Sequence, residues 1–125
     1  MTQLLRNSII TPDGTEIVSR HRHDFVEHTD CLTDHTYFVD GGLDYCRVGG
    51  PTDYLTNYVT SDQHHSHIRE SFEWGSYGVD GTSEMHYIVL KQMSTQHIKA
   101  VIKTQTHLPE EMLRVFQDEL DWRKA

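Results

Sequence analysis

The chain has 125 residues, of which 36% are apolar and 24% are charged. This length favours a single folded domain, and disordered chains are more polar and more highly charged than this one. The formal charge at pH 7 is −8, and through residue 62 ten acidic residues stand against four arginines. Such a charge repels phosphate backbones, so we expect no generic binding to DNA or RNA.

The sequence also argues against a membrane or a secreted location. No apolar run approaches the roughly 20 residues that cross a bilayer, and the start MTQLLRNSII lacks the basic-then-apolar order of a secretory signal. We therefore expect a cytoplasmic protein with no membrane contact. Cys31 and Cys46 are too few for a disulfide framework or a thiolate zinc site, so we expect two reduced thiols.

The first half of the chain has the pattern of β-hairpins. QLLRNSII and TEIVSRH flank TPDG, in which Pro12 and Gly14 favour a turn. HTYFVD and LDYCRV flank Gly41 and Gly42 and predict a second hairpin with a two-residue turn. YLTNYVTS predicts a further strand. Residues 24–29 are predicted to continue the sheet.

The second half combines helices with one strand. The spacing of apolar residues predicts a short helix over 66–74, and MHYIVLK predicts a strand. Ser94 is a good N-cap for a helix through TQHIKAVIKTQ, and Pro109 suits the first turn of a last helix. The apolar face of that last helix is predicted to contain Met112, Val115, Phe116, Leu120 and Trp122.

Together these elements predict an α+β fold: an N-terminal, mainly antiparallel β-sheet of hairpins followed by a helical C-terminal third. We expect residues 1–125 to form one domain. Within it, residues 1–61 would be the β-rich half, and residues 62–125 would contain a helix, a strand and two C-terminal helices.

Four separated strings resemble a family of small uncharacterised proteins encoded by tailed bacteriophages: TPDGTEIVSRHRHDFVEHTD, YFVDGGLDYCR, WGSYGVDG and LKQMSTQHIKAVIKTQ. The resemblance covers roughly residues 8–123. This chain departs from the family pattern at Val48, where an arginine is often found, at Val79, where a lysine is expected, and in the histidine-rich DQHHSH. The resemblance implies a phage accessory protein that acts in the host bacterial cytoplasm during infection, and it carries over no catalytic residue. Such proteins often block host enzymes or host defence.

The histidines predict one candidate metal site. His21 and His23 form an HxH pair that would project from one face of a strand, and Glu27 follows four residues later. This order resembles part of the first metal motif of cupins, although its spacing differs and no second motif is visible. One alternative function is therefore a divalent-metal-dependent hydrolase that uses the His21/His23 pair. The other interpretation is a structural pair at the edge of a sheet.

The arginines predict a competing site for an anion. Arg20, Arg22 and Arg47 are basic residues in an acidic sheet, and guanidinium groups bind phosphate or carboxylate in a bidentate manner. Aromatic rings that could stack on a base of such a ligand come from Tyr37, Tyr45, Tyr54 or Tyr77. Trp74 and Tyr77 would also pin the glycine loop WGSYGVDG, which could close over a ligand or be a plain connector. Ordinary pairing of the arginines with nearby aspartates is the structural alternative.

The alternation of SRHRHDF separates the two sites. His21 and His23 would share one face with Phe25 and point toward the core, while the arginines would point toward solvent or a partner. We therefore expect a non-catalytic accessory or anti-defence protein that binds a host protein or a small anionic, nucleotide-like ligand and needs no cofactor. A minor virion component is a further alternative, and exposed edge strands favour self-association.

Overall fold

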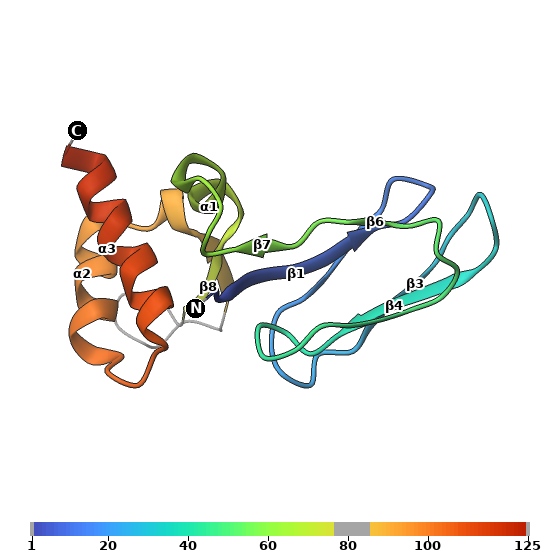
Figure 1. Cartoon of the computed structure of the whole chain (residues 1–125), viewed down its shortest axis with the longest axis horizontal. Helices are drawn as coiled ribbons and strands as arrows, with labels where there is room; N and C mark the ends of the chain where they lie inside the picture. The colour runs from blue at the N-terminus through green and yellow to red at the C-terminus, as the bar shows by residue number, and fades with distance from the viewer. Residues whose placement is uncertain (1, 77–85, 125) are drawn as a thin grey trace. The chain divides into compact units, whose positions relative to one another are not determined.

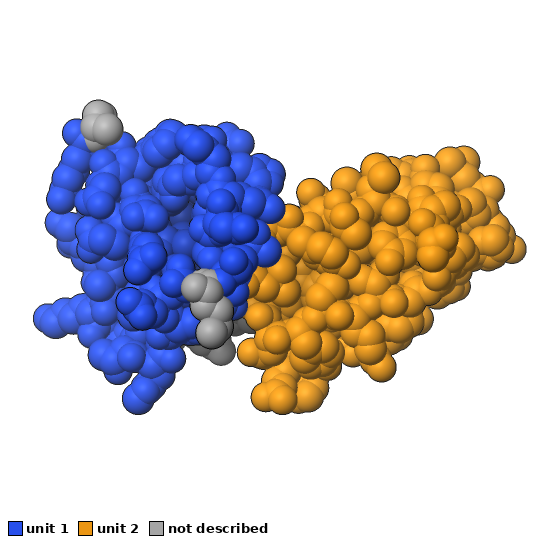
Figure 2. Space-filling view, in the orientation of Figure 1, with its two compact units in different colours: residues 1–3, 60–125 blue, residues 4–59 orange. Residues whose placement is uncertain are grey.

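A computed structural model of the chain describes residues 2–76 and 86–124. It divides into two compact units, coloured separately in Figure 2. We call residues Leu4–Val59 the β unit, and residues Met1–Gln3 together with Thr60–Ala125 the helical unit. The predicted α+β class is confirmed, because antiparallel hairpins precede the helices along the chain (Figure 1). The division falls beside the predicted change of pattern at residue 62.

The first sheet of the β unit is built on the predicted hairpin. β1 (Leu4–Ile10) pairs with β2 (Glu16–Ser19) in antiparallel register, with Ile9 opposite Ile17. Gly14 adopts a φ of +87° in the connecting turn, where its N–H donates to the carbonyl of Thr11 at 2.9 Å. The short strands β6 (Leu55–Thr56) and β7 (Val59–Thr60) also pair with β1. The single strand predicted from YLTNYVTS is therefore two short ones.

The second sheet has the order β3-β4-β5, formed by Val26–Thr29, Thr36–Asp40 and Arg47–Gly49. Its second hairpin exists, but the predicted two-residue turn is wrong: Asp40 pairs with Arg47, so residues 41–46 form a longer loop. The side chain of Asn7 holds this loop, because its Nδ2 donates to the carbonyls of Asp40 (3.0 Å) and Tyr45 (3.3 Å).

The core of the β unit contains Ile9, Ile17, Tyr37 and Val39, contributed by both sheets. The turn after β1 is tied to the turn after β3 by two carboxylates. Asp13 donates its backbone N–H to Asp30 (2.8 Å), and its own carboxylate accepts from His28 (2.8 Å) and from the N–H of Cys31 (3.0 Å). These polar groups are thus satisfied inside the fold.

The helical unit contains three α-helices, one 3₁₀ turn and one hairpin within its described residues. In chain order they are α1 (His65–Ser71), β8 (Glu73–Ser76), β9 (His86–Val89), η1 (Leu90–Gln92), α2 (Thr95–Thr104) and α3 (Glu110–Lys124). Its buried apolar side chains include Ile68, Phe72, Ile98, Val101, Met112, Val115 and Phe116. None of the described helices is both long and apolar enough to cross a membrane.

The predicted helix ends agree with the structure except in α1. Ser94 caps α2 by accepting from the N–H of His97 at 3.0 Å, and α3 begins directly after Pro109. The helix predicted over 66–74 ends at Ser71 instead, and Trp74 lies in β8, paired opposite Ile88. The apolar spacing continues past the helix end because Phe72, directly after the helix, is buried and Trp74 of β8 is half-buried.

Candidate functional site

The stretch SRHRHDF folds as a closed loop. We predicted an extended strand here, with the two histidines on one face and the two arginines on the other, but most of the stretch lies between the end of β2 and the start of β3. The N–H of Asp24 donates to the carbonyl of His21 (3.0 Å), and that of Phe25 donates to the carbonyl of His23 (3.1 Å). These backbone groups bond within the loop rather than across a sheet, so the strand prediction is wrong.

Two side chains close the base of this loop. The hydroxyl of Ser19 donates to the carbonyl oxygen of Asp24 at 2.7 Å. The carboxylate of Asp24 accepts from the backbone N–H of Arg20 at 2.8 Å, and its other oxygen lies 3.8 Å from Nε2 of His21. The first and last residues of the loop are thus bonded to each other, which fixes the backbone between them.

The loop rests on a glycine of the 41–46 loop. The N–H of Gly42 donates to the Ser19 hydroxyl at 2.8 Å, and Gly42 has a φ of +55°. A Cβ atom at this position would lie 2.3 Å from the carbonyl carbon of His21, closer than any real contact. Glycine is therefore required at residue 42 both by its backbone angle and by the approach of the loop.

The four side chains at the tip all face solvent. We call residues 20–23 the basic loop; Arg20, His21, Arg22 and His23 are all exposed. The side chains of Arg22 and His23 make no hydrogen bond or ion pair with any residue that the structure describes. A fixed backbone thus presents a guanidinium and an imidazole that no described side chain satisfies. Sequence reasoning selected these residues but placed the histidines on the wrong side, toward the core.

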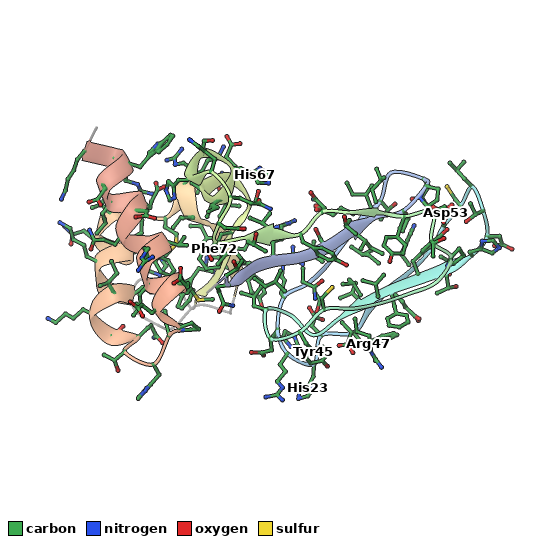
Figure 3. All side chains as sticks on the ribbon, in the orientation of Figure 1. His23, Tyr45, Arg47, Asp53, His67 and Phe72 are labelled. Carbon is green, nitrogen blue, oxygen red and sulfur yellow. The ribbon has the colours of Figure 1, made fainter. Side chains whose placement is uncertain are left out.

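Two other predicted ligand residues lie on the strand and loop that follow Gly42. Tyr45 is 41% exposed, and its carbonyl packs against Gly41. Arg47 begins β5; its side chain is 61% exposed, pairs with Asp40 at 2.8 Å and has its guanidinium carbon 5.4 Å from the centre of the Phe38 ring. Figure 3 labels His23, Tyr45 and Arg47 within the β unit. Arg47 is therefore exposed but already paired.

Of the remaining predicted ligand residues, Trp74 and Tyr77, one belongs to the helical unit and the other is not among the described residues. Trp74 belongs to the helical unit, where its ring packs edge-on against Phe116 with 5.3 Å between centroids. Its local role is thus in packing. Tyr77 lies outside the described residues. A contribution of either ring to ligand binding stays a prediction.

The predicted metal ligands come from different settings. His21 and His23 lie in the basic loop, whereas Glu27 lies in β3, opposite Phe38, and is exposed. In the described parts of the chain, no group of three or more His, Cys, Asp or Glu side chains is arranged to hold a metal ion. The metal hypothesis therefore has no assembled ligand set to support it, and it stays a prediction.

A second cluster of charged side chains lies in the helical unit and was not predicted. Glu119 of α3 is fully buried and accepts from Arg69 at 2.9 and 3.0 Å, from Arg123 at 2.7 Å and from Nε2 of His65 at 2.9 Å. Burial raises the pKa of Glu119, but these hydrogen bonds outweigh it and lower the pKa to about 2. Trp122, predicted in the core, is 41% exposed and covers the Arg69 guanidinium at 5.3 Å. The charged groups of this cluster bond to one another inside the helical unit, so we assign the cluster a structural role.

No protein-family model, curated protein or solved structure matches this chain. The assignment of a function therefore depends on the basic loop and its surroundings. The resemblance to proteins of tailed bacteriophages stays a prediction that rests on the four sequence strings.

Proposed function

We propose that this chain is a non-catalytic binding protein whose basic loop recognises an acidic surface on a partner protein. Following the sequence resemblance, we further propose that it is a phage accessory protein and that the partner is a host protein, such as a component of host defence, met in the bacterial cytoplasm. The proposal places recognition at Arg20, Arg22 and His23.

One observation carries this proposal: the side chains of Arg22 and His23 have no partner among the described residues, although the loop backbone beneath them is fixed by Ser19, Asp24 and Gly42. An arginine held on a preorganised backbone loses less entropy on binding than one on a mobile segment. A planar guanidinium also pairs with a carboxylate through two parallel hydrogen bonds. The loop therefore has the properties of a recognition element.

A protein surface suits this loop better than a small ligand. Sites for small molecules are concave and bury most of the ligand, whereas all four side chains of the basic loop are exposed. A flat acidic surface can approach the loop from one side and contact only the arginines.

The test is charge reversal with capture of partners from a bacterial lysate. Wild-type protein, Arg22→Glu and Lys103→Glu would each be immobilised, and bound proteins would be quantified at two salt concentrations. Lys103 is an exposed lysine of α2 and serves as the matched charge control. We expect a partner that binds the wild type and the control, is lost with Arg22→Glu and is released by salt. Its direct binding would then be measured with purified proteins.

Two further measurements identify a different function. A nucleotide panel in a thermal-shift assay would raise the melting temperature if a nucleotide binds, since a ligand at 100 times its Kd adds about 2.7 kcal/mol of stability. If Arg22→Glu abolished that shift, the ligand of the basic loop would be a small anion and not a partner protein. Elemental analysis of untagged protein that found a full equivalent of divalent metal would instead support the hydrolase alternative at His21 and His23.

A further inference from the structure

Next to the basic loop, two phenylalanine rings form an exposed aromatic pair. Phe25 directly follows the loop, is 50% exposed and stacks on Phe38 of β4 with 4.8 Å between centroids and 25° between ring planes. The Phe38 ring in turn lies against Gly49, where a Cβ atom would come within 1.8 Å of it. The Phe25 ring is thus exposed, while the Phe38 ring beneath it is fixed against the sheet.

The aromatic pair adjoins the basic loop along the chain and an arginine of β5 in space. The backbone N–H of Phe25 donates to the carbonyl of His23, the last residue of the basic loop. On β5, the guanidinium of Arg47 lies over the Phe38 ring at 5.4 Å. Single exposed apolar residues are ordinary on protein surfaces, but phenylalanine and arginine side chains together are enriched at the cores of protein interfaces.

Resting on the proposed function, we infer that the partner presents an acidic segment with one apolar anchor, and that this anchor packs on the exposed face of Phe25 while flanking carboxylates pair with Arg22. We call Phe25, Phe38, Arg47 and the basic loop the recognition face. The charge of the basic loop complements an acidic segment, and the stacked rings supply the apolar contact that arginines alone lack. The segment would bind in an extended form along this face.

Charge separates this occupant from two others. Glu27 lies on the same face of the sheet, cross-strand from Phe38, and the whole chain carries a net charge of −8. A nucleic acid carries a phosphate at every nucleotide, so the net charge of the chain repels it along its whole length, whereas a short segment places its few carboxylates at the basic loop alone. A second copy of this chain carries the same net charge of −8, so that two copies repel each other as a whole.

The experiment is an unbiased selection. A displayed library of random twelve-residue peptides would be selected against the whole protein, and the Kd of the enriched peptides would be measured as synthetic peptides. We expect the enriched sequences to combine several Asp or Glu residues with one aromatic or large aliphatic residue. Phe25→Ala is expected to weaken their binding about tenfold, the usual effect of truncating a central aromatic anchor.

Matched variants separate the two proposals. Leu32→Ala removes another exposed apolar side chain, 72% exposed and outside the recognition face, and should leave the Kd unchanged. Melting curves and Phe25→Leu, which keeps an apolar surface, guard against misfolding. If the peptides are acidic and lost with Arg22→Glu but indifferent to Phe25→Ala, the proposed function stands and this inference fails. If binding ignores Arg22→Glu and salt, or if no peptide is enriched, both fail.

Two further measurements test a nucleic acid and a second copy of the chain as occupants of the recognition face. Fluorescence anisotropy with a twelve-nucleotide poly-dT strand would overturn the inference if that strand bound in the micromolar range and were weakened by Phe25→Ala. Sedimentation analysis would overturn it in favour of a second copy if the wild type were a dimer and Phe25→Ala a monomer. A monomeric wild type with no affinity for the strand is the expected result.

Discussion

The arginines of the Glu119 cluster and those of the basic loop have different surroundings. In the helical unit, Arg69 and Arg123 bond to the fully buried carboxylate of Glu119. In the β unit, the side chains of Ser19 and Asp24 close the basic loop, and the guanidinium of Arg22 has no partner among the described residues. A cluster whose charges pair inside the fold stabilises it, whereas one whose charges face outward is free to bind something else.

Removal of the buried carboxylate should have the largest effect. Glu119→Ala leaves Arg69, Arg123 and His65 facing one another without their acceptor, and we expect a loss of about 4 kcal/mol in the free energy of unfolding of the helical unit. Both tryptophans, Trp74 and Trp122, lie in this unit. Urea unfolding followed by tryptophan fluorescence therefore measures the loss directly.

The control for this variant is Glu110→Ala. Glu110 lies in the same helix, but its side chain is 87% exposed, and its ion pair with Arg114 is long, at 3.8 Å. We expect its removal to change the free energy of unfolding by less than about 0.5 kcal/mol. Equal losses in the two variants would show that the Glu119 cluster does not stabilise the unit.

The same cluster predicts a dependence on pH. Hydrogen bonds from Arg69, Arg123 and His65 lower the pKa of Glu119 from 4.5 to about 2 against the opposing effect of burial. Below pH 4.5 the unfolded chain therefore binds a proton that the folded unit does not, and stability falls as the pH falls toward 2. The loss should approach about 3 kcal/mol, and it is absent above pH 5.

This prediction is measured as a difference, since other carboxylates also titrate in acid. The free energy of unfolding of wild type and of Glu119→Gln would be compared from pH 7 to pH 2.5. The advantage of the wild type should be constant down to about pH 5 and then shrink. A difference that stays constant through the acid range would contradict the assigned role of the Glu119 charge.

Local chemistry made several elements predictable. The TPDG turn and the Ser94 cap depend on side chains within four residues of the groups that they bond, so sequence shows them directly. The basic loop was mistaken for a strand because its HxH alternation also fits a strand. The groups that hold it closed include Gly42, 23 residues away from its partner Ser19.

The Glu119 cluster was unpredictable for the same reason, on a larger scale. Its partners Arg69 and His65 lie 50 and 54 residues away in sequence, and a single Glu in an amphipathic helix gives no sign of burial. The exposed position of Phe25 was also missed, because alternation assigns an aromatic residue to the core. Local sequence patterns identified the charged residues of the basic loop, but they did not predict which side chains are buried and which are exposed.

Gly42→Ala should disturb the basic loop without touching any of its charges. The new Cβ would combine an unfavourable φ of +55° with a 2.3 Å approach to the His21 backbone, so we expect a loss of about 2 kcal/mol in the β unit. Gly14→Ala is the matched control: its φ is +87°, but nothing lies within 4 Å of the added atom, and about 1 kcal/mol should be lost. Amide signals of β1 and β2 during urea titration would measure both losses.

The two glycine variants should differ in partner binding as well. Because only Gly42 contacts the loop, only Gly42→Ala should also shift the amide signals of residues 20–24 in the native state and weaken binding of the captured partner. If both glycine variants weakened it equally, the preorganisation of the loop would have no role in recognition.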